Sequence, residues 1–213
     1  MTTRILLMRH GETAWNRSKV FRGLHDIPLN DTGRAQAMQL GAALATYKIH
    51  AAYTSPLSRA VETAKLALND HDLVAQECAG LADFDYGAWT GLEERVVAQR
   101  WPHEFAVWQT APRLAQIPGG DTLQAVYDRA FATLERISAA HAEQTVALFA
   151  HRVVNKLLVL ACLTLGVERF AFVRQDNSCL NELEYTSTGY VLVRLNDTSH
   201  LRTVGLPLLV ADF

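Results

Sequence analysis

Three pairs of polar residues stand directly after apolar runs of the sequence. Arg9 and His10 follow the run at residues 5–8, Ser55 and Arg59 follow residues 49–54, and His151 and Arg152 follow residues 145–150. Short apolar runs of this kind are typical of buried strands. Open α/β sheets gather functional groups at the carboxyl ends of their strands. The spacing therefore predicts that these residues meet at one edge of a sheet.

A site made of arginines and histidines is suited to phosphoryl chemistry. A guanidinium is a fork-shaped donor that matches phosphate oxygens, often in bidentate fashion. Arg59 is expected in the first turn of a helix, where the dipole disfavours a cation, so an anionic partner is indicated. An imidazole such as that of His10 can carry a phosphoryl group covalently. Phosphoryl transfer needs mainly positioning and charge stabilisation, which arginines and a second imidazole could supply where other enzymes use Mg²⁺.

The elements that must position these residues alternate between strands and helices. This order predicts an α/β fold, a three-layer sandwich with a mostly parallel central sheet, helices on both faces and a small lid insertion. We expect one domain over residues 1–213, with the irregular stretch 92–118 as the lid. We expect strands at residues 4–8, 49–54, 73–76 and 145–150, and two more within 180–195 that are joined by a turn at 187–189. A loop is expected at residues 11–30. Helices are expected at 33–47 behind an Asp31 cap, from Ser55-Pro56 to 68, at 119–141, and at 152–165, where Gly166 would end the helix.

Composition excludes several classes of protein. Lys and Arg number 20 against 22 Asp and Glu, so no basic nucleic-acid footprint is indicated. The sequence has no apolar run long enough to span a membrane and no signal-peptide pattern, and its three cysteines are widely spaced; we expect a cytoplasmic protein. The histidines show no metal-ligand spacing, so neither a metal nor another cofactor is expected. The apolar residues 206–213 could pack on the domain or on a second copy, which would give a homodimer.

Five blocks in order give the sequence a family resemblance. It resembles the histidine phosphatase superfamily, which is the phosphoglycerate mutase-like group. Within that superfamily it resembles the branch of small metal-independent phosphatases in particular. The blocks are Leu7-Met8-Arg9-His10-Gly11-Glu12-Thr13 with Trp15-Asn16, continued by Gly23, Asp26, Pro28-Leu29 and Gly33; Ser55-Pro56-Leu57-Ser58-Arg59-Ala60 with Glu62-Thr63-Ala64; residues 83–91; Pro118-Gly119-Gly120-Asp121-Thr122; and Ala150-His151.

The resemblance implies a role for each matched residue. His10 would be the phosphorylated nucleophile, and Arg9, Arg59 and His151 would hold the phosphoryl oxygens. Asn16 would also contact the phosphoryl group, whereas Arg22 and Gly23 would face the substrate, a small phosphorylated metabolite. The acid that protonates the leaving group would be Asp83, with Asp85 as the alternative.

Two residues depart from the family pattern. Asp83 stands where glutamate is usual, and to stay protonated near neutral pH its pKa must be raised by burial or by nearby carboxylates. Arg152 stands where glycine usually follows the histidine. It could bind a second anionic group of the substrate, or point away and pair with an acidic neighbour.

The length of the expected lid and the spacing of its arginines distinguish between the candidate reactions. Mutases of this group carry a longer insertion with adjacent arginines, whereas Arg95, Arg100 and Arg113 are separated here. We therefore expect a phosphomonoester hydrolase. The alternatives are a cofactor-dependent phosphoglycerate mutase and a phosphate-binding protein with little turnover, the latter suggested by the change from glutamate to aspartate.

Overall fold

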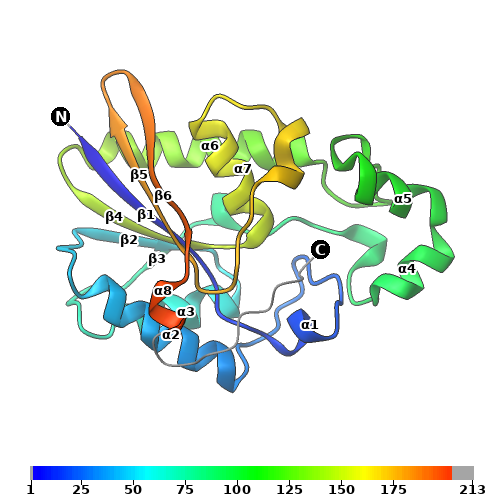
Figure 1. The fold of residues 1–213 in the computed structure, drawn as a ribbon, viewed down its shortest axis with the longest axis horizontal. Coiled ribbons are helices and arrows are strands. Elements are labelled where there is room, and N and C mark those ends of the chain that lie inside the picture. Colours follow the sequence, from blue (N-terminus) through cyan, green and yellow to red (C-terminus); the bar gives the residue numbers. More distant parts are fainter. Residues whose placement is uncertain (1, 203–213) are drawn as a thin grey trace.

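A computed structural model describes residues 2–202 of the chain, and it shows an alternating α/β architecture (Figure 1). Its strands are β1 (Thr3–Arg9), β2 (Ala51–Thr54), β3 (Gln76–Glu77), β4 (Thr145–Ala150), β5 (Leu180–Thr186) and β6 (Gly189–Asp197). Its α-helices are α1 (Ala14–Arg17), α2 (Asp31–Leu44), α3 (Ser58–Ala67), α4 (Glu94–Arg100), α5 (Pro102–Thr110), α6 (Leu123–Ala140), α7 (Arg152–Cys162) and α8 (Ser199–Arg202). Short 3-10 helices cover Ala79–Leu81, Gly87–Trp89, Pro112–Leu114 and Val167–Phe172.

The described strands form one sheet in the order β3-β2-β4-β1-β5-β6. The first four of these run parallel, whereas β5 pairs antiparallel with β1 and β6 pairs antiparallel with β5. In the register of the two central strands, Arg9 pairs with Ala150, so His10 and His151 follow paired positions. The carboxyl ends of β1 and β4 therefore coincide, as the sequence predicts.

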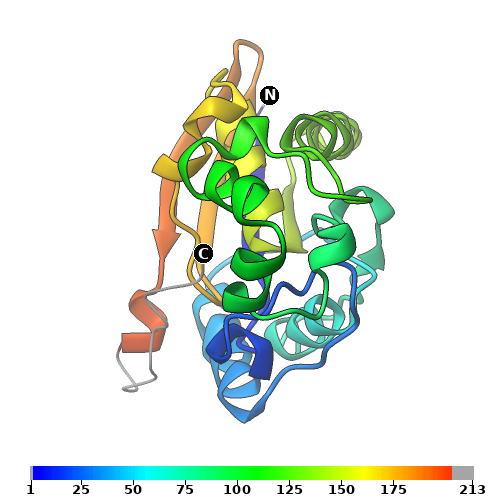
Figure 2. The ribbon, with the colours of Figure 1, turned by 90° about the vertical axis from the view of Figure 1, so that its right-hand side faces the viewer.

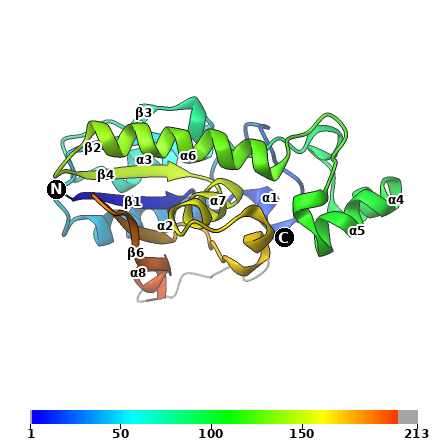
Figure 3. The same cartoon turned by 90° about the horizontal axis from the view of Figure 1, so that it is seen from above.

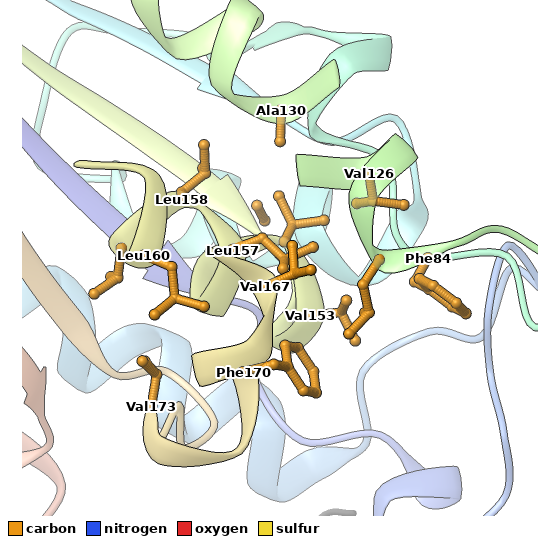
Figure 4. Packing of buried hydrophobic residues seen from close by; sticks show 14 of the residues in the cluster. Phe84, Val126, Ala130, Val153, Leu157, Leu158, Leu160, Val167, Phe170 and Val173 are labelled. Atoms are coloured by element: carbon orange, nitrogen blue, oxygen red, sulfur yellow. The ribbon is translucent and has the colours of Figure 1, made fainter. Parts of the chain in front are cut away.

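Helices cover both faces of the sheet, because the side chains of its central strands alternate between two apolar clusters. Ile5 and Leu7 of β1 join the cluster beneath α6 and α7, whereas Leu6 and Met8 join the cluster beneath α2 and α3. Figure 1 shows the two helical layers above and below the sheet. Figure 4 shows side chains of α7 packing against those of α6 and against Phe170. The predicted three-layer sandwich with a mostly parallel sheet is confirmed.

The segment expected as a lid forms α4, α5 and the 3-10 turn at Pro112–Leu114. These elements lie at one end of the molecule, beyond the carboxyl ends of β1 and β4 (Figures 1 and 3). Viewed from that end, α4 and α5 lie above α1 (Figure 2). Aromatic rings fix α5 to the domain: Trp108 stacks with Phe84 at 5.6 Å and with Phe170 at 6.1 Å between centroids.

Three predicted helix starts are wrong by a few residues, and side-chain capping explains each. The helix expected from residue 119 begins at Leu123, because Thr122 Oγ1 accepts from the Ala125 amide at 3.2 Å. Asn30, not Asp31, caps α2, because its Oδ1 atom accepts from the Gly33 amide at 2.8 Å. The helix expected from Pro56 behind a Ser55 cap begins only at Ser58. There the Asp26 carboxylate, from a distant loop, accepts from the Ser58 amide at 2.7 Å.

Two other local expectations are also wrong. The loop expected at residues 11–30 contains the short helix α1, whose start is held by the side chain of Asn16 (Thr13 amide to Asn16 Oδ1, 2.8 Å). Helix α7 ends at Cys162, and Gly166 opens a 3-10 turn with extended backbone angles. Thr164 takes the left-handed conformation, with φ 57°, so the chain reverses before it reaches the glycine.

Two features bear on partners of the chain. None of the helices within residues 2–202 is long and apolar enough to cross a membrane. The stretch 206–213, expected to pack on the domain or on a second copy, lies outside the described residues.

Candidate active site

The backbone around His10 fixes both the position of the ring and its tautomer. His10 follows β1 and is 1 % exposed. Its amide donates to the Ala150 carbonyl at 3.1 Å, which joins it to the end of β4. Its Nδ1 atom lies 2.7 Å from the Gly11 carbonyl oxygen. A carbonyl only accepts, so Nδ1 carries the proton and Nε2 keeps a lone pair, as a nucleophile requires.

Two buried arginines flank this histidine. Arg9 ends β1 and donates from Nη1 to the Gln175 carbonyl at 2.7 Å. Arg59, in the first turn of α3, donates to the carbonyls of His25 and Gly23, each at 2.9 Å. Both side chains are 1 % exposed or less. Backbone carbonyls thus orient both guanidiniums, and Arg59 also pairs with the Asp83 carboxylate.

The second histidine connects the remaining groups of the site. The rings of His10 and His151 lie 5.2 Å apart between centroids. The Nε2 atom of His151 is 2.7 Å from Ser55 Oγ, and its Nδ1 atom is 3.5 Å from Asp83 Oδ2. The same Oδ2 atom accepts from Arg59 Nη2 at 2.9 Å. The structure therefore brings together Arg9, His10, Arg59, Asp83 and His151, as predicted.

Both imidazoles are kept neutral by their surroundings. Burial lowers the pKa of His10 well below its usual value, and the positive charges of Arg59 and Arg9 lower it further. Burial also lowers the pKa of His151 to about 3, although the Asp83 carboxylate opposes the change. Neutral His10 can donate an electron pair to phosphorus near neutral pH.

Asp83 differs from the expectation in its charge state. Burial alone would raise the pKa of Asp83, but His151, Arg59 and the Phe84 amide outweigh burial, so the pKa lies below the usual value. The Phe84 amide donates to Asp83 Oδ1 at 2.9 Å. The expected raised pKa is therefore wrong for the protein alone: the nearest charged partner is a guanidinium rather than a second carboxylate.

The alternative acid is engaged elsewhere. Asp85 Oδ1 accepts from the Gly87 amide at 2.8 Å, and the Asp85 carbonyl accepts from the Asp121 amide at 2.8 Å. These bonds hold the turn that joins the Gly87–Trp89 segment to the start of α6. Asp83, by contrast, lines the cavity at His10. Geometry thus favours Asp83 as the acid.

The residues expected to face the substrate divide into two groups. Arg22 and Arg152 line the cavity that contains His10 and Asp83, together with Phe21, Tyr86 and other apolar residues. Asn16 and Gly23 support the site instead. Asn16 accepts from Thr13, and the Gly23 carbonyl accepts from Arg59. A direct contact of Asn16 or Gly23 with the substrate stays a prediction.

A buried polar loop behind the site was not predicted. Its members are almost fully buried and hold the Arg9 side chain and the His10 backbone: Asn177 Nδ2 and the Ser178 amide both donate to the His10 carbonyl at 3.2 Å. Gln175 accepts from Arg9 and donates to Asn181 at 2.8 Å. The polar run Gln175-Asp176-Asn177-Ser178 before β5 was the available signal, but only the fold places it beside β1.

A metal would need a cluster of ligands. Within residues 2–202, no group of three or more His, Cys, Asp and Glu side chains is arranged to hold a metal ion. The positive charge of the site comes from arginines.

Comparisons with known proteins agree with this geometry. The family model described as "Histidine phosphatase superfamily (branch 1)" matches residues 5–198. The chain is 29 % identical to phosphoserine phosphatase 1 of Hydrogenobacter thermophilus, over 93 % of the chain and 94 % of that protein. It is 31 % identical to the uncharacterized phosphatase PhoE of Bacillus subtilis, over 93 % and 97 %.

A solved structure of similar sequence has the same fold. Bacillus stearothermophilus YhfR superimposes with a TM-score of 0.90 at 28 % identity, over 93 % of the chain and 99 % of that structure. The two relatives are named phosphatases, which is consistent with the expected phosphoric monoester hydrolase. The chain belongs to the histidine phosphatase superfamily, branch 1.

Proposed function

We propose that the chain hydrolyses phosphomonoesters of small metabolites through a phosphohistidine on His10. One observation carries the proposal: a neutral, buried His10, whose Nδ1 is held by the Gly11 carbonyl, presents Nε2 among Arg9, Arg59 and His151. Such a site combines a positioned nucleophile with fixed positive charge, and phosphoryl transfer needs little more.

In the first step a bond forms between His10 Nε2 and phosphorus while the bond from phosphorus to the ester oxygen breaks. Arg9 and Arg59 stabilise the equatorial oxygens, with His151 beside them. The leaving alkoxide takes a proton from Asp83 and departs as the alcohol. In the second step water gives a proton to the Asp83 carboxylate and its oxygen bonds to phosphorus. The bond to His10 then breaks and inorganic phosphate leaves.

The low pKa of Asp83 in the protein alone is compatible with this acid role. The carboxylate now lies 2.9 Å from the Arg59 guanidinium. A bound phosphoryl group adds negative charge to the cavity and competes for that guanidinium. Both changes raise the pKa of Asp83, so the acid acquires its proton on formation of the complex.

Hydrolysis is favoured over mutase activity by the arginines of the lid. Arg95 is exposed and pairs with Glu93 at 2.7 Å, and Arg100 and Arg113 are exposed. None of these three lines the cavity at His10. A mutase must retain a bisphosphate while its substrate reorients, and this lid supplies no adjacent arginines for that purpose.

Phosphate release from a panel of phosphomonoesters, including phosphoserine, tests the proposal. We expect turnover that is insensitive to chelator, absent from His10→Ala, and unaccompanied by mutase activity in a coupled phosphoglycerate assay with bisphosphate primer. Phosphate binding without any turnover would favour the binding protein instead. Turnover that is lost with chelator would contradict the metal-independent mechanism.

The cytoplasm is the compartment we propose. Cys78, Cys162 and Cys179 are free thiols, and Cys162 and Cys179 are buried. Unpaired buried thiols are usual for proteins of a reducing compartment.

A further inference from the structure

A second cavity adjoins the one at His10. It measures about 390 Å³, whereas the cavity at His10 measures about 10 Å³. The larger value is in the range of small-molecule sites. Arg152 lines both cavities, so it stands where the ester oxygen would join the phosphoryl group to the rest of the substrate. The larger cavity is the natural place for the leaving alcohol.

Positive charge predominates in the larger cavity. Lys19, Arg152 and Lys156 line it, against one carboxylate, Glu94. Arg152 and Lys156 are four residues apart at the start of α7, so their side chains lie on one face of the helix. The N-terminal turns of a helix disfavour cations and favour anions. Arg152 lies in the first turn of α7 and Lys156 one turn later, and the two charges together favour an anionic ligand in the cavity.

Lys156 is unusual because it is a lysine only 5 % exposed. Its Nζ atom donates to the Phe170 carbonyl at 3.2 Å and lies 4.3 Å from the centroid of the Phe170 ring. These contacts orient the ammonium group at the cavity wall. Lys156 and Arg152 also line a neighbouring cavity of about 230 Å³.

Part of the lining of the larger cavity is apolar. Phe105, Trp108 and Pro112 line it together with Phe170, and Trp108 is 6 % exposed. A polar alcohol would leave this aromatic surface without a partner. The cavity therefore suits an alcohol with both a hydrocarbon part and a charged end.

We propose that Arg152 and Lys156 bind a second anionic group, a carboxylate or a phosphate, on the alcohol of the substrate. This inference rests on the proposed phosphatase function and narrows it to phosphomonoesters of acidic alcohols. The hydrocarbon part of the alcohol packs against Phe105 and Trp108. Arg152 and Lys156 thus determine specificity, whereas Arg9 and Arg59 bind the phosphoryl group that is transferred.

The test compares three substrates of equal chain length: phosphorylated hydroxybutanoate, its carboxamide, and butanediol bisphosphate. The ratio of kcat/KM for each anionic ester to that for the amide is measured in wild type, Arg152→Gln, Arg152→Lys and Lys156→Met. We expect a wild-type ratio of at least about tenfold for one anion, falling to about one in Arg152→Gln and Lys156→Met and largely kept in Arg152→Lys. The preferred ester identifies the anion as carboxylate or phosphate.

The control is Arg100→Gln, which removes the same charge from an exposed position on α4. It should leave the ratio unchanged. A wild-type ratio near one, or a ratio that persists in both Arg152→Gln and Lys156→Met, would overturn the inference. Turnover of the amide ester in those cases would leave the phosphatase function intact, whereas absence of turnover for every ester would refute the function itself.

Discussion

The Oδ2 atom of Asp83 lies 2.9 Å from Nη2 of Arg59 and 3.5 Å from Nδ1 of His151. One carboxylate thus contacts a guanidinium expected to bind the phosphoryl group and an imidazole beside the nucleophile. Binding of a phosphoryl group must change the charge balance of this triad. Asp83 is therefore a partner of Arg59 in the protein alone, and we propose it as the acid of the reaction.

Replacing Asp83 should affect substrates according to their leaving groups. For Asp83→Asn we expect kcat/KM to fall by about 10²–10⁴-fold with an alkyl phosphate, because the alkoxide then leaves without a proton. With nitrophenyl phosphate, whose leaving group needs no proton, the loss should be much smaller. Asp83→Glu should retain part of the alkyl activity.

Asp85→Asn is the matched control, because Asp85 holds a turn and does not line the cavity at His10. It should leave the ratio of the two activities unchanged. Equal losses with both substrates in Asp83→Asn would contradict the acid role.

The charge states of the two histidines can be observed directly. Burial lowers the pKa of both His10 and His151, so each should stay neutral below the usual value of 6.5. We expect their ring signals in NMR, assigned from His10→Gln and His151→Gln, to show no titration between about pH 6 and 8. Titration of His10 near pH 6.5 would show that the nucleophile is partly protonated at neutral pH, contrary to the account.

The protein should become less stable in acid, because the pKa of His151 is lower in the folded protein than in the unfolded chain. The unfolded chain binds a proton on His151 near pH 6.5, whereas the folded protein does so only near pH 3. Between these values the unfolded state holds more protons, so the free energy of unfolding falls as pH falls, by about 1.4 kcal/mol per pH unit for one such histidine. The stability that His151 contributes is fully present above pH 6.5 and is lost as the pH falls towards the pKa of His151 in the folded protein.

Denaturant unfolding at several pH values measures this slope. His151→Gln should reduce it, whereas His103→Gln, at an exposed position of α5, should not. An identical slope in wild type and His151→Gln would contradict the lowered pKa.

Thr63 should stabilise the backbone beside the nucleophile. Its Oγ1 atom accepts from the Gly11 amide at 3.0 Å and donates to the Arg59 carbonyl at 2.7 Å. Thr63→Val leaves the buried Gly11 amide without its acceptor, which should lower the free energy of unfolding by about 1–3 kcal/mol and reduce turnover. Thr63→Ser keeps the hydroxyl and should lose less of both. Thermal unfolding and phosphate release give the two readouts, and equal behaviour of the two variants would show that the hydroxyl is unimportant.

The parts of the fold that sequence could predict depend on local patterns. The apolar runs before His10 and His151 are long enough to identify strands, and parallel pairing brings their ends together. The same patterns predicted β4 at its observed bounds and the turn between β5 and β6.

The parts that sequence could not predict depend on contacts between distant residues. The start of α3 is set by Asp26, which lies 32 residues before the amide it accepts from. The pKa of Asp83 is set by His151 and Arg59 as well as by burial. The Gln175 loop supports Arg9 across 166 residues of sequence. None of these partners is visible in a local pattern.

Trapping of the phosphoenzyme tests the central claim most directly. Labelled substrate is mixed with the enzyme, the reaction is stopped in alkali within its first turnover, and the phosphorylated peptide is sequenced by mass spectrometry. We expect an acid-labile phosphoryl group on Nε2 of His10, and no labelled peptide from His10→Gln. A label on any other residue, or undiminished turnover in His10→Gln, would contradict this claim.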